Sequence, residues 1–365
     1  MAVNIVFVRE SASGERRVAL TPETAKKLAA LGAGIVIERG AGVPAHFRDE
    51  AYAGARFSDD GDAALAEADV LVCVQPPANE RLAKMKSGAV VVGLLAPHAD
   101  PGRVPALVSA GLTGFSLEKL PRTTRAQAMD VLSSQAGMAG YKAVLIAAQL
   151  APRYFPMLTT AAGTIRPSKV LIVGAGVAGL QAIATARRLG AQVEGFDVRP
   201  ETREQIESLG GKFLDLGVSA AGEGGYAREL TADERAEQQK RLAEHLKTVD
   251  VIVTTAAVPG RPAPRIITAA MVSGMKPGSV IVDLAAETGG NCELTRPGET
   301  IDSDGVTIAG PLNLASQGAL HASEMYARNV FNFLALSLKD GQLTLDWNDE
   351  LIARTCLAHA GEAKA

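Results

Sequence analysis

The segment that most constrains the fold reads VLIVGAGVAGLQAIATARRLGAQVEGFDVR and spans residues 170–199. Gly174, Gly176 and Gly179 have G-x-G-x-x-G spacing, between a run of β-branched residues and an alanine-rich helical stretch. The first glycine permits a tight turn, the second lets a pyrophosphate approach the backbone, and the third lets the helix pack close to the sheet. The segment therefore predicts a strand–turn–helix unit that binds a dinucleotide.

The end of this segment indicates which dinucleotide binds. Asp197 lies 18 residues beyond Gly179, at the end of the next predicted strand. A carboxylate there accepts hydrogen bonds from the adenosine ribose and repels a 2′-phosphate, which favours NAD(H) over NADP(H). Arg199 weakens that preference, and a plain strand–helix turn with Asp197 capping a loop is the structural alternative. The cofactor-binding residues predicted in this segment are Gly174, Gly176, Val177, Gly179, Asp197, Val198 and Arg199.

Short β-rich runs alternate with helical patterns on both sides of this segment, in a chain of 365 residues that is 47% hydrophobic. This alternation predicts an α/β fold of two Rossmann-like domains, with parallel sheets covered by helices and joined by long helices. We expect residues 1–132 plus 325–365 to form the first domain and 133–324 the NAD(H)-binding domain. A helix is predicted with Thr21 as N-cap and Pro22 as its first residue. The last 25 residues are expected to form a short hairpin and a loose tail.

Composition excludes several classes of function. The net charge is -3 and no dense block of Lys or Arg occurs, so nucleic acid is not an expected partner. The three cysteines are far apart in the sequence, which favours a reducing compartment over a disulfide framework or a metal site. The longest apolar runs hold about ten residues, whereas a membrane-spanning helix needs roughly 20, and no export leader is evident. We expect a cytoplasmic protein.

A second unusual segment, RTTRAQAMDVLSSQAG, covers residues 122–137. It concentrates two arginines, two glutamines and an aspartate, and we call residues 122–133 the polar knot. Taken by itself, it is compatible with an exposed loop that runs into a helix whose N-cap is Asp130 or Ser133.

The polar knot, the glycine segment, TTAAVPGRPAPRIIT and VDLAAETGGNCE together resemble the NAD(H)-binding component, domain I, of proton-translocating nicotinamide nucleotide transhydrogenase. The resemblance runs from Arg16 to about Leu334. Alanine dehydrogenase belongs to the same wider superfamily and resembles this chain in ERRVALTP and in the nucleotide domain.

The resemblance to transhydrogenase implies that hydride passes directly between two nicotinamides, so the site needs rigid placement and no proton donor. It implies that Asp130 orients Arg122, that Gln127 reaches the nicotinamide ribose or carboxamide, and that Ser133 braces Asp130. These four are the predicted catalytic residues.

The resemblance also implies cofactor contacts outside the glycine segment. Tyr226 would lie on a mobile loop that closes over the nucleotide, and Val258 would line the nucleotide crevice. Glu287 is a predicted cofactor-site residue, and Asn291 is a further candidate contact.

The implied assembly is a homodimer that docks to an NADP(H)-binding subunit and a membrane subunit. That arrangement would hold the chain on the cytoplasmic face of the inner membrane.

An NAD-dependent amino-acid dehydrogenase related to alanine dehydrogenase is the alternative function. That family has a lysine where this chain has Gln75, and a histidine near Ala96, two residues before His98. An amide cannot carry the charge that an amino-acid substrate requires. A catalytically silent NAD sensor is a second alternative.

Overall fold

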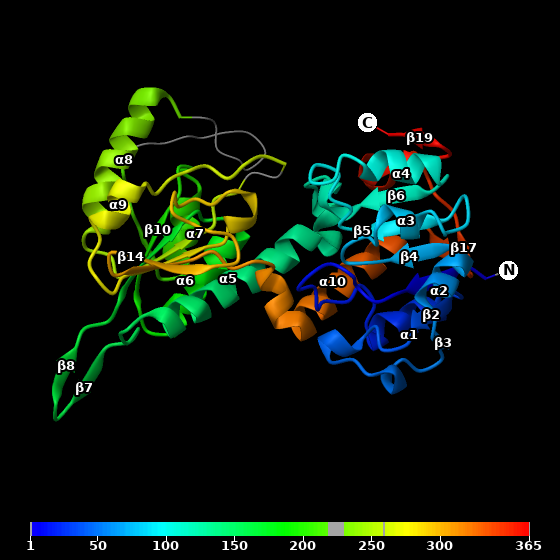
Figure 1. The fold of residues 1–365 in the computed structure, drawn as a ribbon, viewed down its shortest axis with the longest axis horizontal. Helices are drawn as coiled ribbons and strands as arrows, with labels where there is room; N and C mark the ends of the chain where they lie inside the picture. Colours follow the sequence, from blue (N-terminus) through cyan, green and yellow to red (C-terminus); the bar gives the residue numbers. More distant parts are fainter. Residues whose placement is uncertain (1, 218–229, 258–259, 365) are drawn as a thin grey trace. The chain divides into compact units, whose positions relative to one another are not determined.

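The computed structural model describes residues 2–217, 230–257 and 260–364. The chain divides into two compact units, Met1–Gln135 with Ala315–Ala365, and Ala136–Leu314. The expected first boundary at residue 132 lies close to this one. The expected second boundary at residue 324 falls inside a helix, α10 (Ala319–Leu334), which packs as one piece into the core of the first unit. Figure 1 shows the two units as separate α/β bodies.

The first unit is built on a sheet of eight strands in the order β19-β18-β6-β5-β4-β1-β2-β3. Strands β1 to β6 are parallel to their neighbours, as predicted, and β18 runs antiparallel to β6. The strands are β1 (Asn4–Phe7), β2 (Gly34–Glu38), β3 (Arg56–Ser58), β4 (Val70–Val72), β5 (Val90–Gly93), β6 (Thr113–Ser116), β18 (Cys356–His359) and β19 (Glu362–Ala363).

Helices cover both faces of this sheet. Residues of α1, α10 and α11 share one apolar core with the sheet, and residues of α2, α3 and α4 share the other. Besides α10, the helices are α1 (Pro22–Ala30), α2 (Gly61–Glu67), α3 (Asn79–Leu82), α4 (Arg103–Ser109) and α11 (Glu350–Thr355). The predicted start of α1 is confirmed, because Thr21 is its N-cap and accepts a hydrogen bond from the Thr24 amide at 3.4 Å.

The expectation of a loose tail is wrong. A two-stranded hairpin, β16 (Leu338–Lys339) and β17 (Gln342–Leu343), is followed by α11 and by two strands that extend the first sheet. Residues 356–358 are apolar and at most 3% exposed, so this part of the tail is anchored by burial.

The second unit contains a sheet of seven strands in the order β11-β10-β9-β12-β13-β15-β14, parallel except for β14. The strands are β9 (Lys169–Val173), β10 (Gln192–Phe196), β11 (Lys212–Phe213), β12 (Val251–Thr254), β13 (Val280–Asp283), β14 (Thr300–Ser303) and β15 (Val306–Ala309). The predicted α/β class is confirmed in both units.

The helices of the second unit also lie on two faces. Residues of α5, α6 and α7 pack against one face of the sheet, and residues of α8 and α9 against the other. Their bounds are α5 (Val131–Leu150), α6 (Val177–Arg188), α7 (Thr202–Ser208), α8 (Ala232–Leu246) and α9 (Ala269–Ser273). The α5 helix begins in the first unit and continues in the second.

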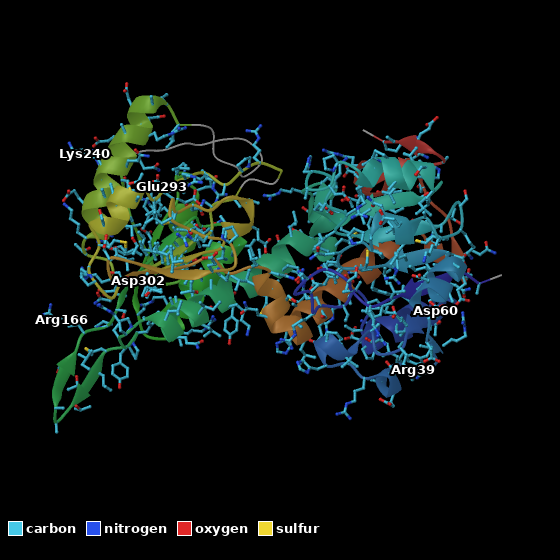
Figure 2. All side chains as sticks on the ribbon, in the orientation of Figure 1. Arg39, Asp60, Arg166, Lys240, Glu293 and Asp302 are labelled. Carbon is cyan, nitrogen blue, oxygen red and sulfur yellow. The ribbon has the colours of Figure 1, made fainter. Side chains whose placement is uncertain are left out.

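A separate hairpin, β7 (Leu158–Thr160) with β8 (Gly163–Ile165), projects from the second unit (Figure 1). Charged side chains such as Arg39 and Lys240 are exposed on the surfaces of the units (Figure 2). Among the residues that the structure describes, no helix has both the length and the apolar character needed to cross a bilayer.

Candidate functional site

The glycine turn between β9 and α6 has the conformation that the sequence predicts. Gly174 has a φ of 96°, which side-chain-bearing residues rarely adopt. A Cβ on Gly179 would lie 1.8 Å from the Gly174 carbonyl oxygen, so only glycine permits this approach of helix to strand. A Cβ on Gly176 would meet no atom within 4 Å, so the space beside this residue is open. Val177, the first residue of α6, is 46% exposed.

The order of the strands places this turn at the position where a ligand is expected. The chain passes from β9 to β10 and β11 on one side, and then returns to place β12 on the other side of β9. Ligands of open parallel sheets bind beyond the carboxyl ends of the strands at such a reversal. The glycine turn follows the carboxyl end of β9.

Asp197 follows the carboxyl end of β10 and is 8% exposed. Its carboxylate accepts hydrogen bonds from the Ala175 amide at 2.7 Å and from the Arg199 amide at 2.9 Å. The Arg199 guanidinium donates two more, at 2.9 Å and 2.8 Å. Burial alone would raise the pKa of Asp197, but these donors outweigh it and hold the pKa below its usual value. Asp197 is therefore a carboxylate at neutral pH, and Val198 beside it packs against the core.

The loop after β12 is held by Asn291, which is fully buried. Asn291 accepts a hydrogen bond from the Ala256 amide at 3.0 Å and donates to the carbonyls of Ala256 and Pro264, each at 2.8 Å. Both amide hydrogens are thus donated to the backbone. Asn291 therefore fixes the loop and has no donor left for the nicotinamide contact that the sequence suggested. Val258 in this loop and Tyr226 lie outside the described residues.

Asp283, at the end of β13, organises the segment that carries Glu287. The Asp283 carboxylate is fully buried and accepts hydrogen bonds from four neutral groups: the hydroxyls of Thr254 and Thr295 and the amides of Ala285 and Cys292. Glu287 itself is exposed on the short helix η5 (Ala286–Thr288) and accepts a hydrogen bond from the Asn313 amide at 2.5 Å. Sequence analysis missed the role of Asp283, although an aspartate that ends an otherwise apolar strand was visible.

The polar knot lies in the first unit on the 3-10 helix η4 (Thr124–Met129). Ala126 and Met129 are buried in the core, while Arg122 and Gln127 are exposed. Two side chains of α10 tie the knot down, since Asn329 and Asn332 donate to the Ala128 carbonyl at 2.9 Å and 2.8 Å. The exposed polar groups therefore stand on an anchored element. Sequence analysis missed both asparagines, which lie about 200 residues further along the chain.

The structure brings Asp130 and Ser133 together. The Asp130 carboxylate accepts hydrogen bonds from the Ser133 amide at 2.9 Å and from the Ser133 hydroxyl at 2.6 Å. This carboxylate thus binds the first turn of α5, as an N-cap does. Arg125 is engaged elsewhere, because its guanidinium pairs with both carboxylate oxygens of Asp349, at 2.7 Å for the Nη1 atom.

A cluster of buried charged groups that sequence analysis also missed lies at the carboxyl edge of the first sheet. The chain order reverses between β1 and β4, and there Glu10 accepts hydrogen bonds from the Val74 and Gln75 amides at 2.6 Å and 3.0 Å. Burial, more than any other influence, raises the pKa of Glu10 to about 8.

Glu15 and Arg17 form the centre of this cluster. The Arg17 guanidinium binds both oxygens of Glu15, at 2.9 Å and 2.7 Å, and donates to Gln135 at 3.0 Å. Burial would raise the pKa of Glu15, but Arg17 outweighs it and lowers the pKa to about 2. The Gln75 amide donates to the same carboxylate at 3.1 Å.

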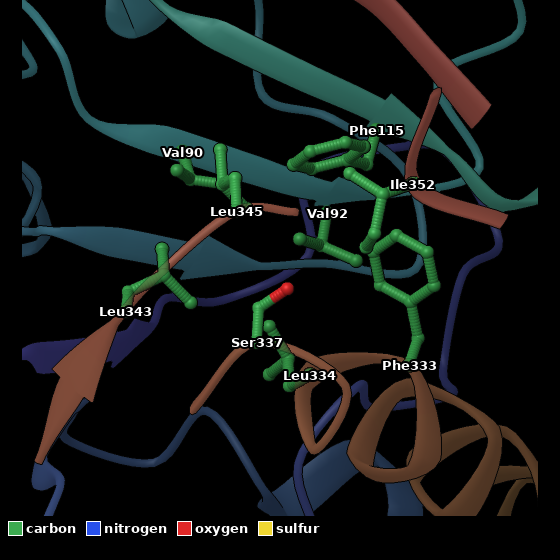
Figure 3. A pocket seen from close by; sticks show the side chains of 9 residues that line it. All are labelled: Val90, Val92, Phe115, Phe333, Leu334, Ser337, Leu343, Leu345 and Ile352. Carbon is green, nitrogen blue, oxygen red and sulfur yellow. The ribbon is translucent and has the colours of Figure 1, made fainter. Parts of the chain in front are cut away.

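The first unit contains a cavity of about 10 Å³, which is enclosed by apolar side chains and the Ser337 hydroxyl (Figure 3). This volume is no larger than one water molecule requires, so the cavity is not a nucleotide site. The lining residues are Val90, Val92, Phe115, Phe333, Leu334, Ser337, Leu343, Leu345 and Ile352.

Comparison with known families decides where this arrangement belongs. Residues 6–139 match the family described as "Alanine dehydrogenase/PNT, N-terminal domain", and residues 143–365 match "Alanine dehydrogenase/PNT, C-terminal domain". The chain belongs to the alanine dehydrogenase/PNT family. The family resemblance inferred from the sequence is confirmed.

Individual relatives separate the two branches of the alanine dehydrogenase/PNT family. The chain is 44% identical to the first of the parts that make up NAD(P) transhydrogenase subunit alpha in Rhodospirillum rubrum, over 98% of this chain and 97% of the relative. The crystal structure of transhydrogenase from Sinorhizobium meliloti matches with a TM-score of 0.90 and 45% identity, over 99% of each chain. Alanine dehydrogenase of Mycolicibacterium smegmatis is 28% identical, over 79% of this chain and 74% of its own. The similarity favours the transhydrogenase branch.

The residues of the first unit agree with that choice within the family. Gln75 spends its amide on Glu15, and Ala96 has a φ of 48° in an exposed turn. His98 in the same turn is also exposed, which does not suit a histidine that must exchange protons with a substrate shielded from water.

Proposed function

We propose that this chain is the NAD(H)-binding subunit of a proton-translocating transhydrogenase. It is an enzyme component that exchanges hydride between NAD(H) bound here and NADP(H) bound on a partner subunit. The observation that carries the proposal is the 44% identity to a transhydrogenase subunit over nearly the whole length of both chains. The alternative of an alanine dehydrogenase has weaker support, at 28% identity.

The second unit fits a nicotinamide dinucleotide. The open space beside Gly176 and the start of α6 suit a pyrophosphate, because helix N-termini attract anions. The ionised Asp197 suits two ribose hydroxyls and disfavours a 2′-phosphate. When bound, the nicotinamide supplies the carbon that gives or takes hydride. The residues of this unit hold and orient that cofactor.

In the first unit, we assign positioning of the nicotinamide to the polar knot. Gln127 and Arg122 are exposed on a short helix whose apolar side is buried, so they can reach a ligand without losing their anchorage. Asp130 and Ser133 stiffen the end of the same segment by their two hydrogen bonds. Such rigidity suits hydride transfer, which requires donor and acceptor carbons within roughly 3 to 3.5 Å. The orientation of Arg122 by Asp130 stays a prediction.

The proposed assembly contains two copies of this chain, an NADP(H)-binding subunit and a membrane subunit, at the cytoplasmic face of the inner membrane. The Rhodospirillum rubrum relative is named as a piece of a subunit alpha, which supports a multi-subunit enzyme. The projecting β7–β8 hairpin supports a homodimer, because Met157 and Ile165 are 64% and 45% exposed and such apolar groups are typical of protein contacts.

A substitution at Gln127 tests the proposal. Gln127→Asn shortens the side chain by one methylene group, so it should slow hydride exchange with a reconstituted NADP(H) subunit about tenfold or more while NADH affinity changes less than threefold. Gln342→Asn is the matched control, because Gln342 is an exposed glutamine of the same unit. Equal losses of exchange rate and affinity would make Gln127 a general binding residue.

The same assays separate the alternatives. Conversion of pyruvate and ammonia by the chain alone, at the rate of a dehydrogenase, would replace the proposal with an alanine dehydrogenase. NADH binding without exchange in the reconstituted complex would leave a sensor.

A further inference from the structure

The Asp197 carboxylate is saturated by the protein itself. A carboxylate has about four lone-pair positions for hydrogen bonds. The Oδ2 atom accepts from the Ala175 amide and from Arg199 Nη2, and the Oδ1 atom accepts from the Arg199 amide and from Arg199 Nε. All four positions are therefore filled.

Only one of these partners can leave without rearranging the fold. The Ala175 amide belongs to the glycine turn, and the Arg199 amide is fixed by the backbone that follows β10. The Arg199 guanidinium stands on a flexible side chain that is 19% exposed, against 7% for Asp197. An adenosine ribose presents two neighbouring hydroxyls, which are donors with the same two-pronged geometry as the guanidinium. The ribose and the guanidinium therefore compete for the same carboxylate.

A displaced guanidinium acquires a new role. It stays within reach of the ribose because it is tethered two residues from Asp197, and it is a strong donor to phosphate oxygens. A 2′-phosphate would be repelled by Asp197 and attracted by the released cation. NADPH would thus gain from Arg199 what NADH loses to it.

We propose that Arg199 is a specificity-determining residue that competes with the adenosine ribose for Asp197 and so narrows the discrimination between NADH and NADPH. The inference rests on the proposed binding of NAD(H) by this unit. It goes beyond a contact list, because it assigns Arg199 an unfavourable effect on binding of the cognate cofactor.

The test replaces Arg199 with methionine, which has similar length and no donor. Asp197 keeps the two backbone amides in this variant. Arg203→Met is the matched control, since Arg203 lies on α7 of the same unit and pairs with Asp215 at 2.8 Å. It removes an equal charge, so it separates the loss of general attraction for an anionic dinucleotide from the loss of competition.

Dissociation constants for NADH and NADPH are measured on the full chain by the fluorescence of the bound nucleotide. We expect Arg199→Met to bind NADH about tenfold more tightly and NADPH more weakly, so that the ratio of the two constants rises more than tenfold. Arg199→Lys keeps the charge but loses the two-pronged geometry, and should fall between wild type and Arg199→Met. Arg203→Met should weaken both nucleotides slightly and leave the ratio unchanged.

Weaker binding of NADH by Arg199→Met, or an unchanged ratio, would overturn the inference and make Arg199 a direct ligand of the cofactor. Failure of the wild-type chain to bind NADH at all would instead refute the proposed function, and the inference with it. The two failures are distinguished by the wild-type titration.

Discussion

Glu10 offers a quantitative test of how the first unit is built. Its carboxyl group lies at the carboxyl end of β1, accepts two backbone amides of the segment after β4, and is partly buried. Burial raises its pKa from 4.5 to about 8, against the opposing effect of the two amides. The perturbation is Glu10→Gln, which removes the titration and nearly keeps the shape.

The sign of the effect follows from proton binding. Between pH 4.5 and about 8 the folded chain holds a proton on Glu10 that the unfolded chain has released. The free energy of unfolding contributed by Glu10 is therefore fully present below pH 4.5 and is lost as the pH rises through 8. The slope within this window is at most about 1.4 kcal/mol per pH unit, and partial exposure of the side chain reduces it.

The neighbouring Glu15 does not obscure this window. Its pKa is lowered to about 2, so its contribution is present above pH 4.5 and is lost only as the pH falls through 2. Glu10→Gln has a further, constant cost, because the NH₂ group of glutamine cannot accept from a backbone amide. One unsatisfied buried amide costs about 1–3 kcal/mol.

The assay is urea unfolding at pH values from 5 to 8.5, followed by the fluorescence of Trp347. This is the single tryptophan of the chain and it lies in the first unit, stacked near Phe115. Midpoints are compared, because the intensity also responds to His359, whose ring lies 4.3 Å from that of Trp347.

We expect Glu10→Gln to unfold at lower urea than wild type at pH 5, and the difference to shrink toward pH 8. Glu23→Gln, at a side chain that is 50% exposed, is the control and should follow the wild-type profile. A constant difference between Glu10→Gln and wild type across the whole range would refute the argument that Glu10 is protonated in the fold.

Two further predictions concern buried polar groups. Ser337→Ala should raise the free energy of unfolding by about 1 kcal/mol, because the Ser337 hydroxyl is buried without a hydrogen-bond partner among the described residues, and urea midpoints would check this; a destabilised variant would show that the hydroxyl has a partner. Asn291→Leu should destabilise the second unit by about 2–4 kcal/mol, because three backbone groups of Ala256 and Pro264 lose their partner. Faster hydrogen exchange at Ala256 than at Val251, in the core of the sheet, would support it, and an unchanged melting temperature would contradict it.

The parts of this structure that follow from the sequence are those in which neighbouring residues decide the outcome. The turn at Gly174 depends on a glycine spacing within six residues, and the start of α1 depends on Thr21 and Pro22. The parallel strands were recognisable because each is a short run of apolar residues that is buried on both faces.

The parts that sequence analysis missed depend on residues far apart in the chain. Strand β18 was assigned to a loose tail because its pairing with β6 joins positions about 240 residues apart, and four residues alone give little signal. The cluster of Glu10, Glu15 and Arg17 is completed by Gln75 and Gln135, from two distant segments. No local pattern shows that these five side chains share one site.

Asp130 shows that a structural and a functional interpretation of one residue can both hold. Considered alone, the segment favoured an N-cap, and the carboxylate does accept from the amide of Ser133 in the first turn of α5. The same hydrogen bonds fix the direction of the carboxylate and of the backbone that leads back to Gln127. A group that must place a ligand within a fraction of an ångström needs such a support, since a mobile side chain would spend binding free energy on its own ordering. The cap is therefore a physical condition for the proposed role of the polar knot, and removing it should loosen Gln127 even where α5 remains folded.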